Sequence, residues 1–305
     1  MAAPVRFASL YHSCGISLIA AIVAPVVAAA QAREVERRGF DEGQGRLIAF
    51  YSAALTFSPA AAPLAAASDR LRLGLELSYI PRLSERQRRA GDKPEATNLA
   101  PLLPRPRAAV TLPGRWMLEA SWIPPLQLFD VKANVGSLAL SRPITAPHAI
   151  TITPRLAGTI GRVEGAITCY DELARGAEDV REYYSEVCYG HRSADHFEPR
   201  HLTGELIGSY ALRRGPLAPY AGIGVRYDRT RFDIGVLKPD AGVPDGPRVR
   251  DPDQPILDLA ATRAYLFAGA TLLVRTRLRT SGELFYAPGS LVTVRVQGSV
   301  DVLGR

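Results

Sequence analysis

The stretch LRLGLELSYI, residues 71–80, decides the fold, because apolar and polar residues alternate in it without a break. The apolar members are Leu71, Leu73, Leu75, Leu77 and Tyr79. The polar members between them are Arg72, Gly74, Glu76 and Ser78. Successive side chains of a β-strand point to opposite faces, so this pattern predicts a strand with one apolar and one polar face.

The end of the chain repeats the pattern, with valines at every second position of the stretch VTVRVQGSVDV, residues 292–302, apart from Gly298. The same alternation recurs between these two stretches and predicts ten strands in all. They are residues 70–80, 106–112, 115–124, 131–142, 148–166, 199–213, 217–234, 258–274, 276–287 and 290–303.

The connections between the predicted strands alternate in length. The long, polar ones are residues 81–105, 167–198 and 235–257, and the short ones are 113–114, 143–147, 214–216 and 275. The proline pairs Pro104/Pro106 and Pro124/Pro125 are interpreted as strand stops. Long loops at one end and tight turns at the other are typical of outer-membrane barrels, whose even strand number returns both termini to the periplasm.

A soluble β-sandwich would show the same alternation, but its core would then contain the polar faces. Burying arginine and glutamate without partners is costly, whereas a barrel lumen lets them pair with each other or with water. The sequence therefore predicts an all-β, antiparallel up-and-down transmembrane β-barrel of about ten strands, within a range of about eight to twelve. A soluble secreted β-protein is the alternative.

Three stretches carry a resemblance to a known group of proteins: YAGIGVRYD (220–228), TSGELFYAPGS (280–290) and the valine-rich last strand. They resemble small bacterial outer-membrane β-barrel proteins, the OmpA-like and related barrels. The resemblance implies location in the outer membrane. The chain departs from this pattern at its end, Val302-Leu303-Gly304-Arg305, where such barrels usually have an aromatic residue on the last strand.

The N-terminal part divides into two further segments. Residues 1–32 have Arg6, an apolar run over 15–27 and small residues over 28–32, which predicts a secretory signal peptide. An uncleaved N-terminal anchor is the alternative. Residues 33–69 are predicted to form a periplasmic N-terminal segment and linker, and residues 70–305 the barrel.

The two cysteines that follow the signal peptide, Cys169 and Cys188, are expected to form a disulfide, since paired cysteines in an exported chain usually do. Two free thiols are the alternative. The tyrosines and acidic residues between these cysteines make the loop a candidate for contacting a surface ligand. A local helical cap with internal ion pairs is the other interpretation.

Charged residues on the polar strand faces are predicted to gather in the lumen. They are Arg72, Glu76, Arg115, Glu119, Arg155, Glu205, Arg213, Arg226, Asp228, Glu283, Arg295 and Asp301. Two roles are open: an ion-paired filling that stabilises the barrel, or a narrow polar pore whose charges set selectivity.

Five aromatic residues are predicted to form girdles at the two membrane boundaries, where amphipathic rings are favoured. They are Tyr79, Trp116, Trp122, Tyr210 and Tyr220. Ordinary packing within a sheet core is the alternative.

Charge and motifs limit the function classes. The net charge of +7 comes from arginines spread along the chain, which argues against nucleic acid as a partner. No cofactor or metal motif is found, and Ser193 with nearby histidines and Asp195 lacks a nucleophile motif, so no enzyme is predicted. The predicted role is a structural, surface or minor channel protein in contact with outer-membrane lipid. The sequence does not indicate an oligomeric state. Alternatives are a narrow transporter of small or hydrophobic molecules and a membrane-embedded hydrolase.

Overall fold

The computed structural model describes most of the chain after its first 32 residues. The described ranges are 33–63, 71–88, 100–129, 131–145, 150–170, 188–212, 216–239 and 248–303. The predicted signal peptide, residues 1–32, lies outside them. No helix within these ranges is long and apolar enough to cross a membrane.

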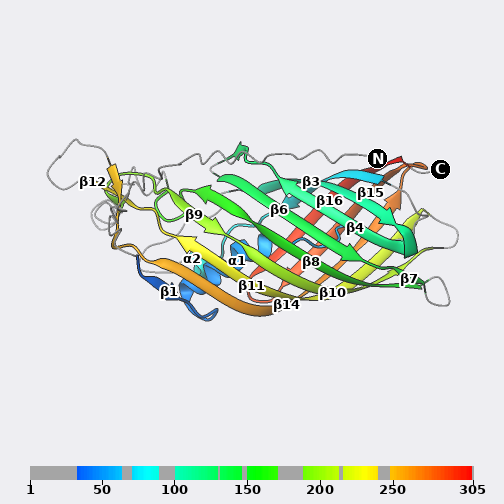
Figure 1. The fold of residues 1–305 in the computed structure, drawn as a ribbon, viewed down its shortest axis with the longest axis horizontal. Helices are drawn as coiled ribbons and strands as arrows, with labels where there is room; N and C mark the ends of the chain where they lie inside the picture. Colours follow the sequence, from blue (N-terminus) through cyan, green and yellow to red (C-terminus); the bar gives the residue numbers. More distant parts are fainter. Residues whose placement is uncertain are drawn as a thin grey trace, which may run out of the picture. The chain divides into compact units, whose positions relative to one another are not determined.

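Ten antiparallel strands form a closed barrel (Figure 1). They are β2 (Leu71–Tyr79), β3 (Leu102–Leu112), β4 (Trp116–Ile123), β6 (Val131–Ser141), β8 (Ile150–Gly165), β10 (Arg200–Tyr210), β11 (Leu217–Asp233), β14 (Ile256–Leu273), β15 (Leu278–Ala287) and β16 (Leu291–Leu303). The ring closes where β16 pairs with β2, which brings Val294 opposite Tyr79. Closing the sheet gives its edge strands partners, which lipid cannot supply. The predicted fold class and strand number are confirmed.

The two ends of the barrel differ, and we name them by their connections. The long-loop end carries the connections β2–β3, β4–β6, β8–β10, β11–β14 and β15–β16, and the short-turn end carries the others. Shorter elements at the long-loop end are β1 (Val35–Arg37), α2 (Glu85–Arg88), β5 (Gln127–Leu128), β9 (Asp195–Glu198), β12 (Leu237–Pro239) and β13 (Arg248–Arg250). The short-turn end has the 3-10 turn η1 (Pro113–Arg115) and β7 (Ile144–Thr145).

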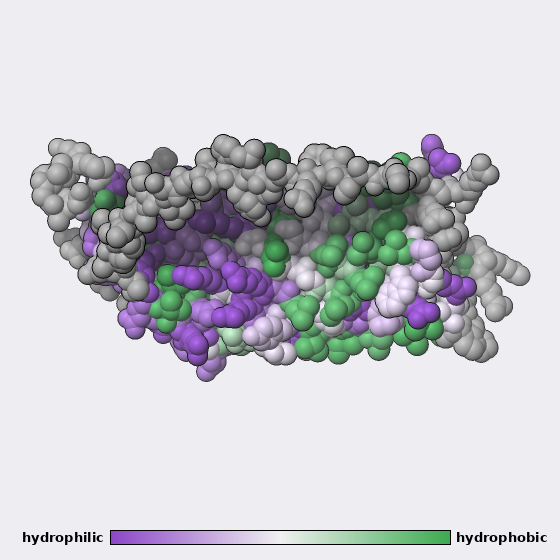
Figure 2. Space-filling view, in the orientation of Figure 1, coloured by the Kyte–Doolittle hydropathy of each residue, from purple (hydrophilic) through white to green (hydrophobic). Residues whose placement is uncertain are grey.

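The outer face of the barrel is apolar, as the strand alternation predicts. Along β10, for example, Leu202 and Leu206 are more than half exposed, while Thr203 and Glu205 between and beside them are buried. Figure 2 shows the hydrophobic side chains gathered over part of one side of the barrel. The solvent that suits such a surface is a hydrocarbon layer, so this face is a lipid-facing belt.

Strand β3 begins earlier than the sequence indicated, at Leu102. Pro104 and Pro106 therefore lie inside the strand and do not stop it, which corrects that interpretation. The pairing of β3 with β4 starts only at Arg107, so both prolines lie where β3 pairs with β2 alone. A proline lacks an N–H group and is tolerated where one side of a strand has no partner.

Residues 43–63, which precede β2 in the chain, lie inside the barrel. β1 pairs with the start of β14 at the long-loop end, and α1 (Gly43–Ala54) then enters the barrel with most of its residues buried. Residues 55–63 continue toward the short-turn end, where the amide of Ala62 donates to Thr271 Oγ1 at 2.8 Å. We call residues 43–63 the plug. The sequence predicts a periplasmic segment and linker over residues 33–69, but residues 43–63 of this range lie in the lumen.

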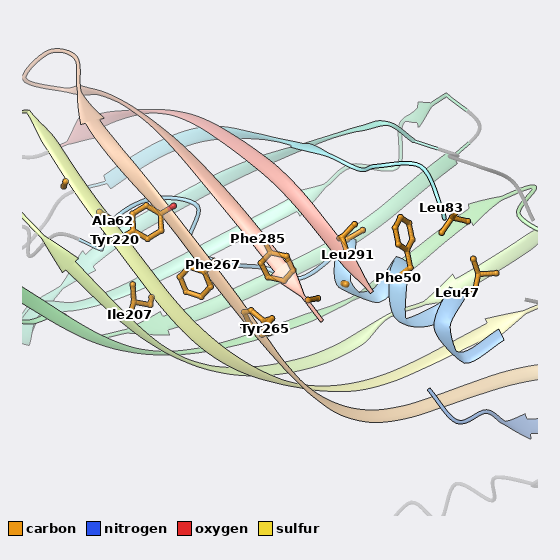
Figure 3. Close-up of a cluster of buried hydrophobic side chains, with 14 residues drawn as sticks. Leu47, Phe50, Ala62, Leu83, Ile207, Tyr220, Tyr265, Phe267, Phe285 and Leu291 are labelled. Atoms are coloured by element: carbon orange, nitrogen blue, oxygen red, sulfur yellow. The ribbon is translucent and has the colours of Figure 1, made fainter. Parts of the chain in front are cut away.

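Two glycines of β11 make room for aromatic residues of the neighbouring strand. A Cβ atom on Gly224 would lie 2.2 Å from the Tyr265 ring, and one on Gly222 would lie 2.4 Å from the Phe267 ring. Figure 3 shows these two rings in the lumen together with Tyr220 and Phe285. The glycines of the YAGIGVRYD stretch are therefore explained by this close approach.

Candidate functional site

The extended part of the plug is held by guanidinium groups of the barrel wall. Arg105 of β3 donates to the carbonyl oxygens of Leu55 at 3.1 Å and Thr56 at 3.2 Å. Arg295 of β16 donates to the Thr56 carbonyl at 3.0 Å. Arg155 of β8 donates to the Phe57 carbonyl at 2.8 Å, and Arg107 of β3 to the Ser58 carbonyl at 2.9 Å. An extended chain leaves its carbonyls without partners, and a buried carbonyl requires one. The wall arginines supply these partners.

The next residues of the plug bond to β14 and β15. The amide of Ala60 donates to Glu283 at 3.1 Å, and its carbonyl accepts from Ser281 at 2.6 Å. Glu283 also accepts from the Ser58 hydroxyl and, at 3.1 Å, from Tyr220. These bonds make the plug contact opposite sides of the lumen.

Among the described residues, the charges closest to the plug include equal numbers of arginines and carboxylates. Five buried arginines stand there, and they are Arg105, Arg107, Arg155, Arg226 and Arg295. Five carboxylates accompany them, and they are Glu76, Glu119, Glu205, Asp228 and Glu283. The closest pairs are Arg107–Glu76 at 2.6 Å, Arg226–Asp228 at 2.6 Å and Arg155–Glu205 at 2.7 Å. Buried charges need such partners, because desolvation otherwise costs several kcal/mol per ion.

One aromatic residue of the plug lies among three of these arginines. Phe57 is 1% exposed, and its ring centroid lies 4.3 Å from the Arg107 guanidinium carbon and 4.8 Å from that of Arg155. Arg105 lies at 5.7 Å. A guanidinium within about 6 Å of a ring is attracted by the ring quadrupole. Phe57 therefore adds side-chain contacts to the backbone bonds of the plug.

The helical part of the plug has different surroundings, which are apolar. Leu47, Phe50 and Ala54 share a buried cluster with Leu83 and Leu291 (Figure 3). Between α1 and the wall lies an apolar pocket of about 60 Å³. Its lining residues are Phe50, Tyr51, Ala54, Leu55, Ile80, Leu83, Ala100, Leu103, Val131, Ala133, Val163, Ile167 and Phe197. The inward wall is therefore charged beside residues 55–60 and mostly apolar beside α1, where Ser52 near the end of the helix contacts Thr230 and Arg226.

Most of the charged residues predicted for the lumen are found inside the barrel. Arg72 and Asp301 pair at 2.9 Å near the short-turn end, apart from the charges around the plug. Arg115 is exposed in η1 with a positive φ of 64°, because the turn, and not β4, includes it. Its predicted luminal position is therefore corrected. Arg213 lies outside the described residues.

Two luminal arginines that hold the plug, Arg105 and Arg107, were not among the predicted residues. The predicted strand 106–112 excludes Arg105, and although it includes Arg107, the prolines beside this residue hide the alternation that would assign it to the inward face. The signal that could have found them is the alternation of LPRPR, residues 103–107, in which the arginines share one face.

Four of the five predicted girdle residues are exposed on the outer face. Tyr79 and Trp122 lie near the long-loop end, and Trp116 and Tyr210 near the short-turn end. Tyr220 is different, because it is 4% exposed and points into the lumen toward Glu283. Its predicted outward position is corrected: it falls on the inward face of β11, like Arg226.

The predicted disulfide is present between Cys169 and Cys188, whose Cα atoms are 5.7 Å apart. Asp195 organises the chain beside it. Its carboxylate accepts from the Thr168 amide at 2.6 Å, the Gly235 amide at 2.7 Å and the Ser193 hydroxyl at 2.7 Å. Residues 171–187, which contain most of the proposed surface-ligand loop, lie outside the described residues.

The histidines considered for a hydrolase have other neighbours. His196 Nε2 lies 3.2 Å from Asp233, and His201 Nε2 lies 3.4 Å from Asp228. Ser193 donates its hydroxyl proton to Asp195 rather than to a histidine. Within the described part of the chain, these residues are not assembled into a Ser–His–Asp triad.

The sequence matches no family model, and no curated protein matches it. Solved structures with a similar course of the chain include the toluene transporter TodX of Pseudomonas putida (12% identity, 83% of this chain and 72% of that chain, TM-score 0.31). Another is the translocator domain of the autotransporter NalP from Neisseria meningitidis (10% identity, 85% and 94%, TM-score 0.34). A third is the outer membrane protein Omp33 of Acinetobacter baumannii (5% identity, 76% and 98%, TM-score 0.30).

The closed barrel and its apolar outer belt carry the structural conclusion by themselves. Ten antiparallel strands surround a polar lumen and turn leucine, isoleucine and valine outward. A surface of this kind is stable in a bilayer and not in water. The chain is a transmembrane β-barrel of the bacterial outer-membrane type.

Proposed function

We propose that the protein is an outer-membrane barrel that its own N-terminal residues keep closed. The observation that carries this proposal is the arginine contact with consecutive plug carbonyls, from Leu55 to Ser58. A segment held in this way occupies the path that ions would take. In the proposed orientation the long-loop end faces the outside of the cell, and the exposed aromatic residues mark the two membrane boundaries.

Conductance across a planar bilayer tests the proposal. The full chain is expected to give no steady conductance, while a variant lacking residues 33–63 is expected to conduct, because the deletion opens the lumen. Heat-modifiability on a gel establishes that each variant forms a barrel. A folded deletion variant that does not conduct, or a full chain that conducts steadily, would contradict the proposal.

The deletion can also prevent folding, so a milder variant is needed. Arg107→Gln combined with Arg295→Gln weakens the bonds to Ser58 and Thr56 without removing the plug. We expect brief openings in this variant. The control is Arg275→Gln combined with Arg277→Gln, which changes two exposed arginines at the short-turn end. Openings in the control and none in the luminal variant would contradict the proposal.

The apolar pocket beside α1 favours a second candidate, the binding of small apolar molecules. Strand alternation elsewhere places charges inside the barrel, whereas here Leu103, Val131, Ala133 and Val163 face the plug helix. Apolar cavities stay dry and accept apolar guests. The pocket of about 60 Å³ suits a small guest or one end of a larger molecule.

Xenon is a suitable probe for this pocket, and its binding can be followed by xenon NMR of the barrel in micelles. Ala133→Leu fills the pocket and is expected to abolish the bound-xenon signal. Ala120→Leu adds the same volume to the exposed face of β4 and is the matched control. An unchanged signal in the Ala133 variant would exclude the pocket as the binding site.

A further inference from the structure

Four arginines gather on the outer face of the barrel at the long-loop end, and neither the lumen nor the plug uses them. They are Arg37 of β1, Arg200 of β10, and Arg229 and Arg231 of β11, all exposed. With Val35 and Asp258 they line a hollow of about 500 Å³. We call these four residues the rim arginines.

The rim arginines follow directly on the apolar belt. The outward residues of β11 run from Ile223 and Val225 to Tyr227, each about half exposed, and then to Arg229 and Arg231. Figure 2 shows the same change on this side of the barrel, where hydrophilic residues gather toward the end that carries β1. Along the membrane normal, from the bilayer core toward water, membrane proteins present apolar residues first, then aromatic residues, and then cationic ones.

The spacing places the rim arginines at headgroup depth. A strand rises about 3.3 Å per residue, so Arg229 and Arg231 stand roughly 7 and 13 Å beyond Tyr227 along β11. Strand tilt shortens these distances along the membrane normal. The headgroup region on each side of a bilayer is about 5–8 Å thick, which the two residues therefore span.

The rim arginines outnumber the carboxylates beside them, which are Asp258, opposite both Arg37 and Arg231, and Glu198, opposite Arg231. Arg200 lies 3.8 Å from Glu198, but no carboxylate of the described residues lies within 4.0 Å of a guanidinium nitrogen of Arg37, Arg229 or Arg231. The register His201 opposite Asp228 also brings Arg200 and Arg229 to neighbouring positions on adjacent strands. Like charges at such positions repel, and the residue of β14 opposite Arg229 is Ala260, so no carboxylate of that strand offsets the repulsion at Arg229.

We propose that the rim arginines bind the phosphate groups of a phosphorylated glycolipid in the outer leaflet. One guanidinium group can bind two oxygens of the same phosphate. Several guanidinium groups around one hollow therefore suit a headgroup that carries two phosphates. The lipid chains then lie along the outward Leu202, Leu206 and Val225 of the same strands. This inference rests on the proposed membrane orientation, but not on the plug being closed.

Binding of diphosphorylated lipid A to the purified barrel in detergent tests the inference, with dephosphorylated lipid A as the second ligand. Arg229→Gln combined with Arg231→Gln is expected to lower the affinity for the diphosphorylated form at least about tenfold, since charge-assisted hydrogen bonds are lost. Arg275→Gln combined with Arg277→Gln removes the same charge at the other end and is expected to leave the affinity within about twofold.

Three outcomes would overturn the inference. The first is equal affinity in the two double variants, both heat-modifiable. The second is equal binding of the dephosphorylated lipid. The third is full displacement by millimolar inorganic phosphate, which would identify a site for free anions. Conductance is not involved in this assay, so failure here is distinguishable from failure of the closed-barrel proposal.

Discussion

The two parts of the plug are held in the barrel by different forces. In α1 most backbone groups bond within the helix, and apolar side chains such as Ile48 and Phe50 pack against apolar residues, with polar contacts to the wall at Ser52. Residues 55–60 have left the helical hydrogen-bond pattern, and the wall opposite their carbonyls is built of arginines such as Arg105 and Arg155.

This difference explains why the inner wall changes character along the barrel. A helix inside a lumen needs apolar contacts, because its polar groups are already paired. An extended segment needs donors and acceptors from outside itself. The residues of the wall therefore complement the conformation of the plug both beside α1 and beside residues 55–60. The two parts can be tested separately.

The largest effect is expected in the extended part, from Arg155→Met. The change removes the closest cationic partner of Glu205 and Glu119 and the donor to the Phe57 carbonyl. Breaking a buried ion pair on one side costs about 3–5 kcal/mol. Urea unfolding in lipid vesicles measures the loss, with Arg277→Met as the exposed control. Equal stability of the two variants would show that the guanidinium contacts do not hold the plug.

The helical part should respond to the loss of apolar volume instead. Phe50→Ala removes a ring that is 3% exposed, and we expect a loss of about 3 kcal/mol in the same unfolding experiment. The conservative Phe50→Leu should cost less than about 1.5 kcal/mol. If Phe50→Ala were neutral, α1 would not be packed as part of the barrel core.

A smaller effect is expected from Gly224→Ala, which acts on Tyr265, a residue with both aromatic and charged neighbours. Its ring packs on Phe285, with centroids 5.1 Å apart, and its hydroxyl donates to Glu205. Gly224→Ala would push against this ring and is expected to cost about 1–3 kcal/mol. Gly204→Ala is the control, because nothing lies within 4 Å of its Cβ position. A Gly224 variant as stable as the control would contradict the close approach.

The smallest effect is expected at Arg115, which belongs to neither part. Because the residue is exposed in η1, Arg115→Gln should change the free energy of unfolding by less than about 0.5 kcal/mol. Thermal unfolding of the two proteins side by side would show this. A loss comparable to that of Arg155→Met would place Arg115 among the luminal charges after all.

The barrel fold could be predicted from the sequence, because a barrel in a membrane requires apolar and polar residues to alternate along each strand. Lipid outside and charge inside require opposite residue types at successive positions, so nine of the ten strand positions could be read closely from the chain. In β3 the prolines interrupt the alternation, so the predicted strand omits Arg105 and the inward position of Arg107 is not evident.

The plug could not be predicted for a different physical reason. The sequence GQGRLIAFYSAA of α1 indicates a helix that is buried, but it does not indicate which surface buries it. Residues 55–63 carry few charged or alternating positions, since their bonds to the wall come from the backbone, which every sequence has. Tyr220 was misplaced for a related reason: a tyrosine suits a membrane boundary and a luminal hydrogen bond equally well.

The seam between β2 and β16 has a consequence for assembly. The plug precedes β2 directly in the chain, yet it lies on the inside of the ring that β2 completes by pairing with β16. Once these two strands have paired, guanidinium and aromatic groups leave too little space in the lumen for α1 to pass through it. The plug must therefore be in the lumen before β2 pairs with β16, so that insertion of the plug and closure of the barrel belong to one assembly step.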